Sequence, residues 1–384
     1  MKRLRVLALE PYHGLSHAAF LEGYARHSRH EVEIWSLPPR KWKWRMRGSA
    51  YHFADLARRP GALAPDAVLA SDFLNLCEWR ALAPPRFGSA PSLLYFHENQ
   101  VTYPLGELAP RDFHYGWINL SSALAADRIL FNSSFHREEF IRAVTAVLAR
   151  MPDHVPGGLP ERIRERSGVF PVGIDFEPHR RALARRPAVR EGPPVLLWNH
   201  RWEHDKGPDL LAGALIELHR GKVPFRAVIC GQTSTRKPRA SDGGGPLASA
   251  ALELGDRVLH LGYIARREEY LDRVAGADIV VSTARHDFFG VAVVEAMFLG
   301  CLPVLPRALA YPEIVPAHLH PELLYEPGTL AEFLSGFLRS PPYHLQEEVA
   351  AAAGRFDWVH LAPELDRILE ALAAQSRDAQ EPER

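Results

Sequence analysis

The sequence predicts an α/β protein with two doubly wound parallel-sheet domains, and three observations carry this prediction. At 384 residues and 47% hydrophobic side chains, the chain is long enough to bury two cores. Short apolar strands alternate with helical stretches along it, a pattern typical of parallel sheets covered by helices. A polar, basic and proline-rich run at 180–194 separates two series of strands and is interpreted as an interdomain linker.

The expected strands of the first series are 4–9, 32–37, 67–70, 92–96, 128–132 and 167–172. Those of the second series are 195–199, 226–230, 258–261, 278–282 and 302–305. The domains are expected at 1–185 and 186–345, followed by a helical segment at 346–375 that packs back toward the first domain and a disordered tail at 376–384. Ligands bind at the carboxyl ends of such strands, so we expect the two domains to face a cleft.

Composition narrows the class of protein. Lysine plus arginine equals aspartate plus glutamate at 46 each, so a nucleic-acid partner has no support from overall charge and must be argued from local patches. The apolar runs are shorter than a membrane span, and the first strand leads into a His-rich loop rather than a signal-peptide cleavage region. The expectation is a cytoplasmic protein without membrane association. Cys77, Cys230 and Cys301 lack metal-ligand spacing and are expected to be buried thiols.

An acidic residue lies on each side of a glycine turn in the segment 285–304. The run 277–282 before the turn predicts a buried strand, and 291–299 has helical composition that ends at Gly300. Asp287 is therefore expected at the carboxyl end of a strand, and Glu295 about two turns along the next helix. A carboxylate near a helix start is often only a cap. At this edge, however, two carboxylates also suit the hydroxyls of a sugar nucleotide, and Gly290 permits close approach of the backbone.

Two cations follow the first strand of the second series. Arg201 and Lys206 lie between that strand and the next helix, where a guanidinium fork, an ammonium and the helix N-terminus suit a diphosphate. For an isolated pair of this kind, two solvated charges would be the favoured interpretation. Their shared sheet edge with Asp287 and Glu295 favours the functional interpretation.

The first series offers two polar loops at the same kind of edge. Gly14 follows the first strand and can bring backbone N–H groups near a phosphate, although one glycine is a weak signal. His97 opens the polar run 97–100 after the fourth strand and is expected to point into the cleft. Packing and catalysis are equally consistent with a histidine there.

A local basic patch interleaves cations with aromatic rings near the start of the chain. Such a patch pairs phosphate-binding charge with rings that stack on unpaired bases, and its members are Arg40, Lys41, Trp42, Lys43, Trp44, Arg45 and Arg47. The alternative is a basic loop whose tryptophans pack on the first domain. A second basic group, interpreted as solvated surface or a phosphate contact, comprises Arg236, Lys237 and Arg239.

These features resemble the retaining GT-B glycosyltransferases, in which an acid-x7-acid segment, an Arg/Lys pair and a first-domain His line a donor site. The first acid of that segment is usually Glu and is Asp287 here. A finer resemblance, to the tRNA-queuosine mannosyltransferase family, runs from about residue 7 to 306 and is carried by segments 37–47, 95–100, 111–116, 131–133, 152–154 and 197–206. Where that family tends to have two glycines before Ser-His, this chain has Gly14 and Leu15.

The resemblance implies two Rossmann-like domains and transfer of mannose from GDP-mannose to queuosine in the anticodon of tRNA-Asp, with retention and without a metal or other cofactor. It implies a first domain that binds the tRNA and a second that binds the nucleotide sugar. Catalytic roles fall to His97, Arg201, Lys206 and Asp287. Donor-binding roles fall to Gly14, Ser16, Arg201, Lys206, Asp287, Phe289, Gly290, Val291 and Glu295. Glu98 and Asn99 join the basic patch as expected tRNA contacts.

Within this picture Asp287 holds sugar hydroxyls, Glu295 holds the ribose and His97 contacts the sugar near its reacting carbon. Two alternatives stay open from the residues themselves. One is a GT-B enzyme that acts on a lipid or small-molecule acceptor, although no strongly amphipathic basic helix is apparent in the first domain. The other is a non-catalytic protein that binds tRNA or a sugar nucleotide. Oligomeric state is not predicted.

Overall fold

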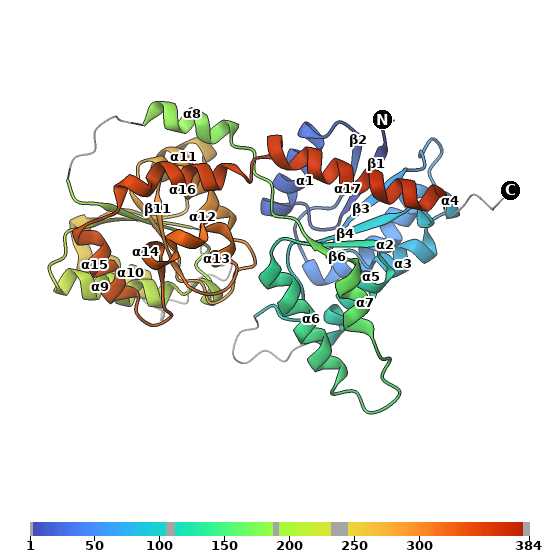
Figure 1. Cartoon of the computed structure of the whole chain (residues 1–384), viewed down its shortest axis with the longest axis horizontal. Helices are drawn as coiled ribbons and strands as arrows, with labels where there is room; N and C mark the ends of the chain where they lie inside the picture. Colours follow the sequence, from blue (N-terminus) through green and yellow to red (C-terminus); the bar gives the residue numbers. More distant parts are fainter. Residues whose placement is uncertain (1–2, 105–111, 187–191, 232–244, 379–384) are drawn as a thin grey trace. The chain divides into compact units, whose positions relative to one another are not determined.

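The computed structural model describes residues 3–104, 112–186, 192–231 and 245–378, and these residues form two compact units (Figure 1). The first unit is made by 1–175 together with 356–384, and the second by 176–355. The chain therefore passes between the units twice, after Asp175 and again before Phe356. The expected tail, at 376–384, lies outside the described residues from 379 onward.

The first unit is built on a six-stranded sheet of order β2-β1-β3-β4-β5-β6, and every neighbouring pair is parallel. Its strands are β1 (Arg5–Glu10), β2 (Glu31–Ser36), β3 (Ala67–Ser71), β4 (Ser92–Phe96), β5 (Arg128–Phe131) and β6 (Ser167–Val169). Strands β3 and β4 are buried along their whole length, because helices cover both faces of a parallel sheet. The six predicted strands are confirmed, with shifts at their ends.

The helices of the first unit are α1 (Leu15–His27), α2 (Trp42–Ala57), α3 (Leu76–Leu82), α4 (Pro85–Gly88), α5 (Phe113–Ala125), α6 (Ser134–Leu148), α7 (Leu159–Arg166) and α17 (Trp358–Asp378). Several begin at side-chain caps: Asn75, Asp112 and Ser133 each accept a hydrogen bond from an N–H of the first turn. Apolar side chains such as Phe53, Trp79 and Phe140 fill the core between these helices and the sheet.

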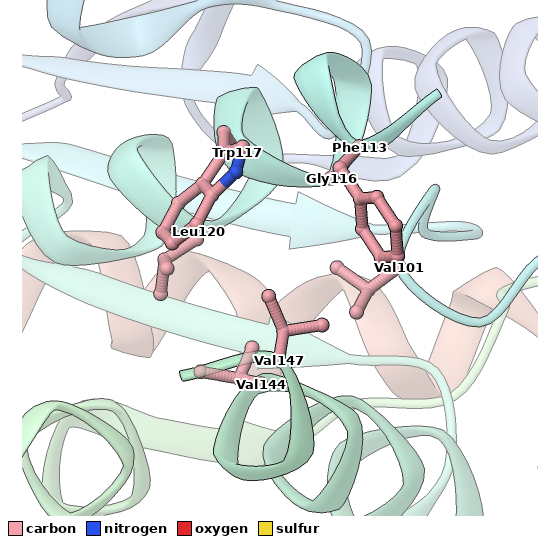
Figure 2. Close-up of a pocket in the computed structure, with 7 residues that line it drawn as sticks. All are labelled: Val101, Phe113, Gly116, Trp117, Leu120, Val144 and Val147. Atoms are coloured by element: carbon pink, nitrogen blue, oxygen red, sulfur yellow. The ribbon is translucent and has the colours of Figure 1, made fainter. Parts of the chain in front are cut away.

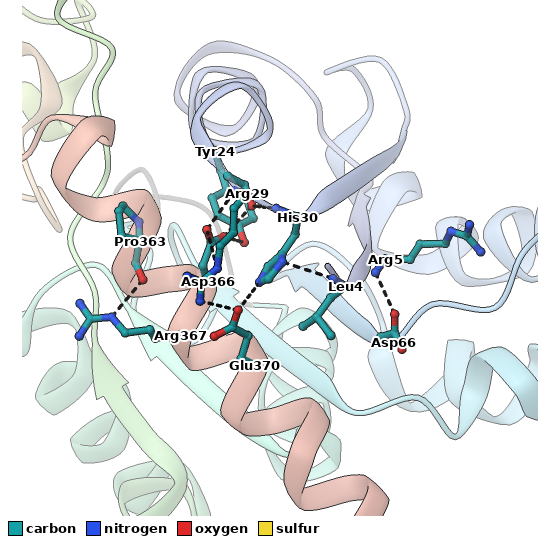
Figure 3. Close-up of polar contacts among 11 residues, drawn as sticks. Leu4, Arg5, Tyr24, Arg29, His30, Asp66, Pro363, Asp366, Arg367 and Glu370 are labelled. Atoms are coloured by element: carbon teal, nitrogen blue, oxygen red, sulfur yellow. Dashed lines mark hydrogen bonds and ion pairs between the residues drawn. The ribbon is translucent and has the colours of Figure 1, made fainter. Parts of the chain in front are cut away.

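Helix α17, from the end of the chain, packs against α1 of the first unit (Figure 3). The Asp366 carboxylate is buried and accepts hydrogen bonds from the Tyr24 hydroxyl at 2.7 Å, the Ser28 hydroxyl at 2.6 Å and the Arg29 N–H at 3.0 Å. One turn further along, Glu370 contacts the Arg29 guanidinium and lies 3.3 Å from Nε2 of His30. A buried carboxylate needs several donors, so these contacts fix the position of α17 along α1.

The second unit has its own parallel sheet, of order β12-β11-β10-β7-β8-β9. Its strands are β7 (Val195–Asn199), β8 (Arg226–Cys230), β9 (Val258–Gly262), β10 (Ile279–Val281), β11 (Leu302–Pro306) and β12 (Leu324–Tyr325). The five predicted strands are confirmed. Strand β12 was not predicted, because two residues are too few to show a period.

The helices of the second unit are α8 (Glu177–Arg185), α9 (Pro208–Arg220), α10 (Gly245–Leu254), α11 (Arg267–Ala275), α12 (Val291–Phe298), α13 (Tyr311–Ile314), α14 (His320–Leu323), α15 (Leu330–Arg339) and α16 (Gln346–Gly354). Single 3₁₀ turns are η1 (His204–Lys206), η3 (Gly255–Arg257), η4 (Ala317–Leu319) and η5 (Tyr343–Leu345). Gly300 follows α12 with φ +86°, as predicted for a residue that ends a helix.

The interpretation of 180–194 as a linker is wrong for its first part. Residues 180–185 belong to α8, which buries His179 and Ala182 against the second unit and directs its arginines outward. Arg185 bonds Asp272 of α11 at 2.7 Å. The basic composition therefore reflects the solvated face of an amphipathic helix, whereas residues 187–191 lie outside the described part of the chain.

Candidate functional site

Strand order brings the predicted site loops of the second unit together. From β7 the chain continues to β8 and β9 on one side of the sheet, and β10 then pairs with the other side of β7. The loops after β7 and β10 therefore lie next to each other at a topological switch point, where open α/β sheets bind ligands. Lys206 follows β7 and Asp287 follows β10.

Lys206 and Asp287 form the central ion pair of this edge. The Lys206 ammonium donates to the His286 carbonyl at 2.8 Å and to Oδ2 of Asp287 at 3.3 Å. Oδ2 also accepts from the Tyr311 hydroxyl at 3.2 Å, and Oδ1 accepts from the Phe289 N–H at 3.3 Å. Burial alone would raise the pKa of Asp287, but the nearby Lys206 and His200 lower it. Asp287 is thus held as a carboxylate.

Backbone contacts fasten the two loops to each other. The Asp205 carbonyl accepts from the Arg285 N–H at 2.8 Å, and the Thr283 hydroxyl donates to the Lys206 carbonyl at 2.8 Å. Gly207 makes this approach possible, because it has φ +65° and a Cβ at this position would clash with the Thr283 carbonyl. The position of Lys206 is therefore fixed by the backbone of both loops.

His200 and Arg201 lie between β7 and this ion pair. His200 is buried, and its Nε2 has no hydrogen-bond partner among the residues that the structure describes. Burial first, and then the charge of Lys206, lower the pKa of His200 to about 4, so the ring is neutral. Arg201 has a half-exposed side chain, with Nη1 3.3 Å from Oε2 of Glu203. The Arg201 side chain is therefore more exposed than that of Lys206, which is 12% exposed.

Glu295 lies in α12 and is buried beside a separate set of side chains, Arg267 and His179. Its carboxylate contacts the guanidinium of Arg267 and lies 3.5 Å from Nε2 of His179. Burial alone would raise the pKa of Glu295, but His179 and Arg267 lower it. The structure therefore places Glu295 with Arg267 and His179, rather than with the Lys206–Asp287 pair.

The turn between the two acids is shaped by Gly290. It has φ +92° and precedes Val291, the first residue of α12. A Cβ at Gly290 would lie 3.0 Å from the Tyr311 ring, so a side chain there would press on the residue that bonds Asp287. Phe289 is buried, and its contribution to the site is the N–H that reaches Asp287.

The first unit has an equivalent switch point, between β1 and β3. Glu10 ends β1, Asp72 follows β3 and His97 follows β4. The His97 N–H donates to Oδ1 of Asp72 at 3.0 Å, and its carbonyl accepts from Asn132 at 2.9 Å, so the backbone of His97 is held on both sides. Its ring lies against the ring of His17, with centroids 4.0 Å apart.

Ligand-type atoms of Glu10, His17 and His97 lie within 4.8 Å of one another. A hydrogen bond of 3.1 Å joins Nδ1 of His17 to Oε2 of Glu10, and the second oxygen of Glu10 accepts from the Tyr12 N–H at 2.8 Å. Two of the three side chains, His17 and Glu10, are thus already joined by a hydrogen bond. We therefore interpret this group as an ion pair beside a histidine, not as a cation site.

The loop after β1 contains Gly14, which packs against another side chain, and Leu15, which has a left-handed backbone. Gly14 has an extended backbone and lies against the Pro39 ring, so its small size serves packing as well as any ligand. Leu15 has φ +49°, a region that favours glycine, and its side chain is 77% exposed. Ser16 is exposed in the first turn of α1. The second glycine common in the resembling family therefore corresponds to a position of left-handed backbone.

The Asn99 side chain holds the loop after β4 by hydrogen bonds within it and is not part of the exposed surface. It is fully buried, its oxygen accepts from the N–H groups of Val101 and Thr102, and its amide nitrogen lies 3.0 Å from Nε2 of His136. The expected tRNA contact by Asn99 is thus inconsistent with its burial. Glu98 is half-buried and accepts from the Gln100 side chain at 2.9 Å.

The basic patch forms the first turns of α2, and its two tryptophans differ. Trp42 is half-buried and packs on Tyr115 of α5 with ring centroids 4.9 Å apart. Trp44 is 64% exposed and lies over Gly48 of the same helix, where a Cβ would come within 2.8 Å of the ring. Of the two rings, Trp44 is therefore the one that can receive a base.

Two cations of this patch lie over the packed rings of Trp42 and Tyr115. Lys43 lies over Trp42 and Tyr115 at 5.6 and 5.5 Å, and Arg47 lies over Tyr115 at 5.3 Å. Arg45 donates to the Pro38 carbonyl at 3.0 Å, whereas Arg40 and Lys41 are exposed. Arg236, Lys237 and Arg239 lie outside the described residues.

An apolar pocket lies between α5 and α6 (Figure 2). Phe113 and Trp117 stand on its two sides, with Val101, Val144 and Val147 among the other residues that line it. None of the predicted site residues lines this pocket. It therefore adds no polar chemistry to the site.

Comparison with known proteins agrees with both halves of this description. The family model for the N-terminal part of tRNA-queuosine alpha-mannosyltransferase matches residues 5–174, and the model for glycosyl transferases group 1 matches residues 179–350. The tRNA-queuosine alpha-mannosyltransferase of Drosophila melanogaster is 38% identical over 343 residues, which cover 88% of this chain and 87% of the relative. The chain belongs to the tRNA-queuosine alpha-mannosyltransferase family.

This chain is also similar to a more distant relative, the GDP-mannose-dependent alpha-(1-6)-phosphatidylinositol dimannoside mannosyltransferase of Mycobacterium tuberculosis. The two are 26% identical over 82% of this chain and 76% of the relative. Among solved structures, sucrose-phosphate synthase of Thermosynechococcus elongatus aligns with a TM-score of 0.70 at 18% identity, covering 97% of this chain and all of that one. These similarities and the two parallel six-stranded sheets confirm the predicted GT-B class with two Rossmann-like units. The protein is thus a glycosyltransferase, which excludes the non-catalytic alternative.

Sequence reasoning did not single out several residues that complete this mannosyltransferase-family site. Tyr311 bonds Asp287 from α13, a helix that nothing in the sequence links to the loop after β10. Arg267 and His179 reach Glu295 from α11 and α8. His200 stands beside Arg201, and its position directly after an apolar strand was the one available signal. No helix in the described part of the chain is long and apolar enough to cross a membrane.

Proposed function

We propose that this protein transfers mannose from GDP-mannose, with retention, to queuosine in the anticodon of tRNA-Asp. The observation that carries the proposal is the 38% identity to a tRNA-queuosine alpha-mannosyltransferase over most of both chains. The name of the mycobacterial relative, a GDP-mannose-dependent enzyme, supports GDP-mannose as the donor. The tRNA and the nucleotide sugar are the partners in this proposal, and the protein acts in the cytoplasm.

The second unit supplies the chemistry expected for the departing diphosphate. Negative charge grows on the diphosphate as the glycosidic bond breaks, and fixed cations stabilise it best where little reorganisation is needed. Lys206 is held by the His286 carbonyl and by Asp287, which supports it as a fixed cation, and in this proposal Asp287 accepts hydrogen bonds from sugar hydroxyls. Arg201 adds an exposed guanidinium, and a guanidinium can bind phosphate oxygens in pairs. In this proposal charge on the leaving group is met by these side chains, and no metal is required.

In this proposal the first unit supplies groups for the transferred sugar and for the tRNA acceptor. His97 contacts the transferred sugar near its reacting carbon, and Trp44 offers a ring for an unpaired base of the anticodon loop. Arg40, Lys41 and Lys43 are exposed in the same segment and suit the phosphate backbone. Glu295, in the second unit, holds the ribose of the donor in exchange for its present contact with Arg267.

The experiment that tests the donor assignment compares GDP-mannose with UDP-galactose and UDP-glucose in a radiolabel-transfer assay with bulk tRNA. Transfer is expected from GDP-mannose alone, and efficient transfer from a UDP-sugar would contradict the assignment. Arg201→Ala is expected to reduce kcat about 10²- to 10³-fold while the Kd for tRNA stays near that of the wild type. An equal loss of turnover and tRNA affinity would show that Arg201 serves the acceptor instead.

A further inference from the structure

The network beneath His97 contains a buried ion pair that the proposed mechanism does not use. Glu10 is fully buried at the end of β1, and His17 is buried in the first turns of α1. A 3.1 Å hydrogen bond joins them as an ion pair. Burial by itself disfavours a charged imidazole, but Glu10, with Asp72 and Glu98 at longer range, raises the pKa of His17 to about 9. His17 is therefore an imidazolium at neutral pH.

His97 meets this cation face to face. The two rings are 4.0 Å apart and inclined by 31°, whereas Phe20 and Tyr95 contact His97 edge-on at 5.0 and 4.7 Å. A second positive charge on His97 would be buried beside the first, and the carboxylate within 4.8 Å of a His97 ring nitrogen is Glu10, which already bonds His17. Burial, followed by the charge of His17 and then that of His136, accordingly lowers the pKa of His97 well below its ordinary value.

The other titratable groups of the cluster do not replace this pair. Burial raises the pKa of Asp72 well above its usual range, and one oxygen of Asp72 already accepts from the His97 N–H. The groups that face the two histidines are Glu10 from β1, Tyr12 from the loop after it, Asp72 from the loop after β3, Tyr95 from β4, Glu98 from the loop after β4 and His136 from α6. Glu10 is the member that bonds His17 directly.

We propose that His17 is a positioning residue for His97: paired with Glu10, it places a positive charge against the His97 ring and keeps that ring in its neutral form. A neutral imidazole offers one N–H donor and one lone pair, so it can both donate to and accept from sugar hydroxyls. An imidazolium offers donors only, and it would repel the positive charge that develops on the anomeric carbon. The inference rests on the proposed function to the extent that His97 acts on the sugar.

The test is a histidine titration of the full-length protein by ¹⁵N NMR, which reports the protonation of each ring without any substrate. In His17→Gln the charge facing His97 is lost, so the pH at which His97 titrates is expected to rise by about one unit or more. His27→Gln is the matched control, because His27 lies in the same helix and its ring bonds the Gly23 carbonyl of that helix. It is expected to leave His97 unchanged.

Glu10→Gln keeps both imidazoles and provides a second variant if His17→Gln does not fold. Without the carboxylate, His17 is expected to titrate well below pH 9. The acidic limb of the pH–rate profile for sugar transfer is expected to move to higher pH in His17→Gln and to stay in place in His27→Gln. A His97 that titrates at the same pH with and without His17, or a His17 that is neutral at pH 7 in the wild type, would overturn the inference. Absence of mannose transfer by the wild type would instead refute the proposed function and leave the titrations interpretable.

Discussion

The Lys206–Asp287 pair allows a quantitative test of how the donor site is built. Lys206→Met removes the ammonium but keeps most of the side-chain volume, and it leaves the Asp287 carboxylate with the hydrogen bonds from Tyr311 and the Phe289 N–H. Breaking a buried ion pair by removing one partner costs about 3–5 kcal/mol. The side chains are 12% and 16% exposed and two hydrogen bonds remain, so we expect the lower figure, about 3 kcal/mol.

For a domain of this size, a loss of about 3 kcal/mol corresponds to a decrease in Tm of roughly 6–12 °C for the second unit. Differential scanning calorimetry at several pH values measures it. The pKa of Asp287 in the folded wild type lies below its unfolded value, so its stabilising contribution is present above about pH 4 and is lost as the pH falls through the folded pKa. In Lys206→Met that pKa rises. The stability difference from wild type is therefore expected to be largest near pH 7 and to shrink toward acid.

Two further variants control this prediction. Lys206 also lies 3.6 Å from the buried Asp205 carboxylate, so Lys206→Met leaves two carboxylates without this cation. Asp287→Asn in the Lys206→Met background removes one of these charges and is expected to recover part of the lost stability, which a double-mutant cycle quantifies. Lys222→Met changes an exposed lysine of the same unit and is expected to leave Tm unchanged. A Lys206→Met protein as stable as wild type, or a double variant no more stable than the single one, would refute the assignment of Lys206 as the counter-ion of Asp287.

Other regions give independent predictions. Trp44→Ala is expected to weaken tRNA binding by about 1–3 kcal/mol in a filter-binding assay without lowering Tm. Trp42→Ala is expected to lower Tm, because it removes a half-buried ring. The reverse pattern would contradict the assignment of Trp44 as the stacking residue. Tyr24→Phe is expected to reduce the free energy of unfolding by about 1.5–3 kcal/mol, since it removes a donor to the buried carboxylate of Asp366. Urea denaturation measures this change, and no change would argue against tight docking of α17. Sugar transfer is expected to persist in EDTA, and its loss would show that a metal is needed.

Much of the architecture could be predicted because its strands are short, apolar and rich in β-branched residues, with turn residues between them. Strand order could not, since no local pattern shows that β10 pairs with β7. The contact of Lys206 with Asp287 depends on that pairing, and the sequence analysis could place both residues only on one edge. Tyr311, Arg267 and His179 were missed for the same reason, because each reaches its carboxylate from a helix distant in sequence.

Local helix geometry explains two other differences between the sequence-based predictions and the structure. The residues 180–185 were interpreted as part of a linker from their charge, but Ala182 and His179 form a narrow buried face of α8. Trp42 and Trp44 were treated as a pair, yet residues two positions apart lie on nearly opposite sides of a helix. Recognising 42–57 as a helix would have separated the packed ring from the exposed one.

The most direct test of the central claim is a transfer assay with labelled GDP-mannose and two preparations of tRNA, one that contains queuosine and one that lacks it. Nuclease digestion and nucleoside chromatography then identify the labelled product. The proposed function predicts label in a single mannosylated queuosine nucleoside, and only from the queuosine-containing tRNA. Equal label in both preparations, or no label in either from protein shown to bind GDP-mannose, would contradict it.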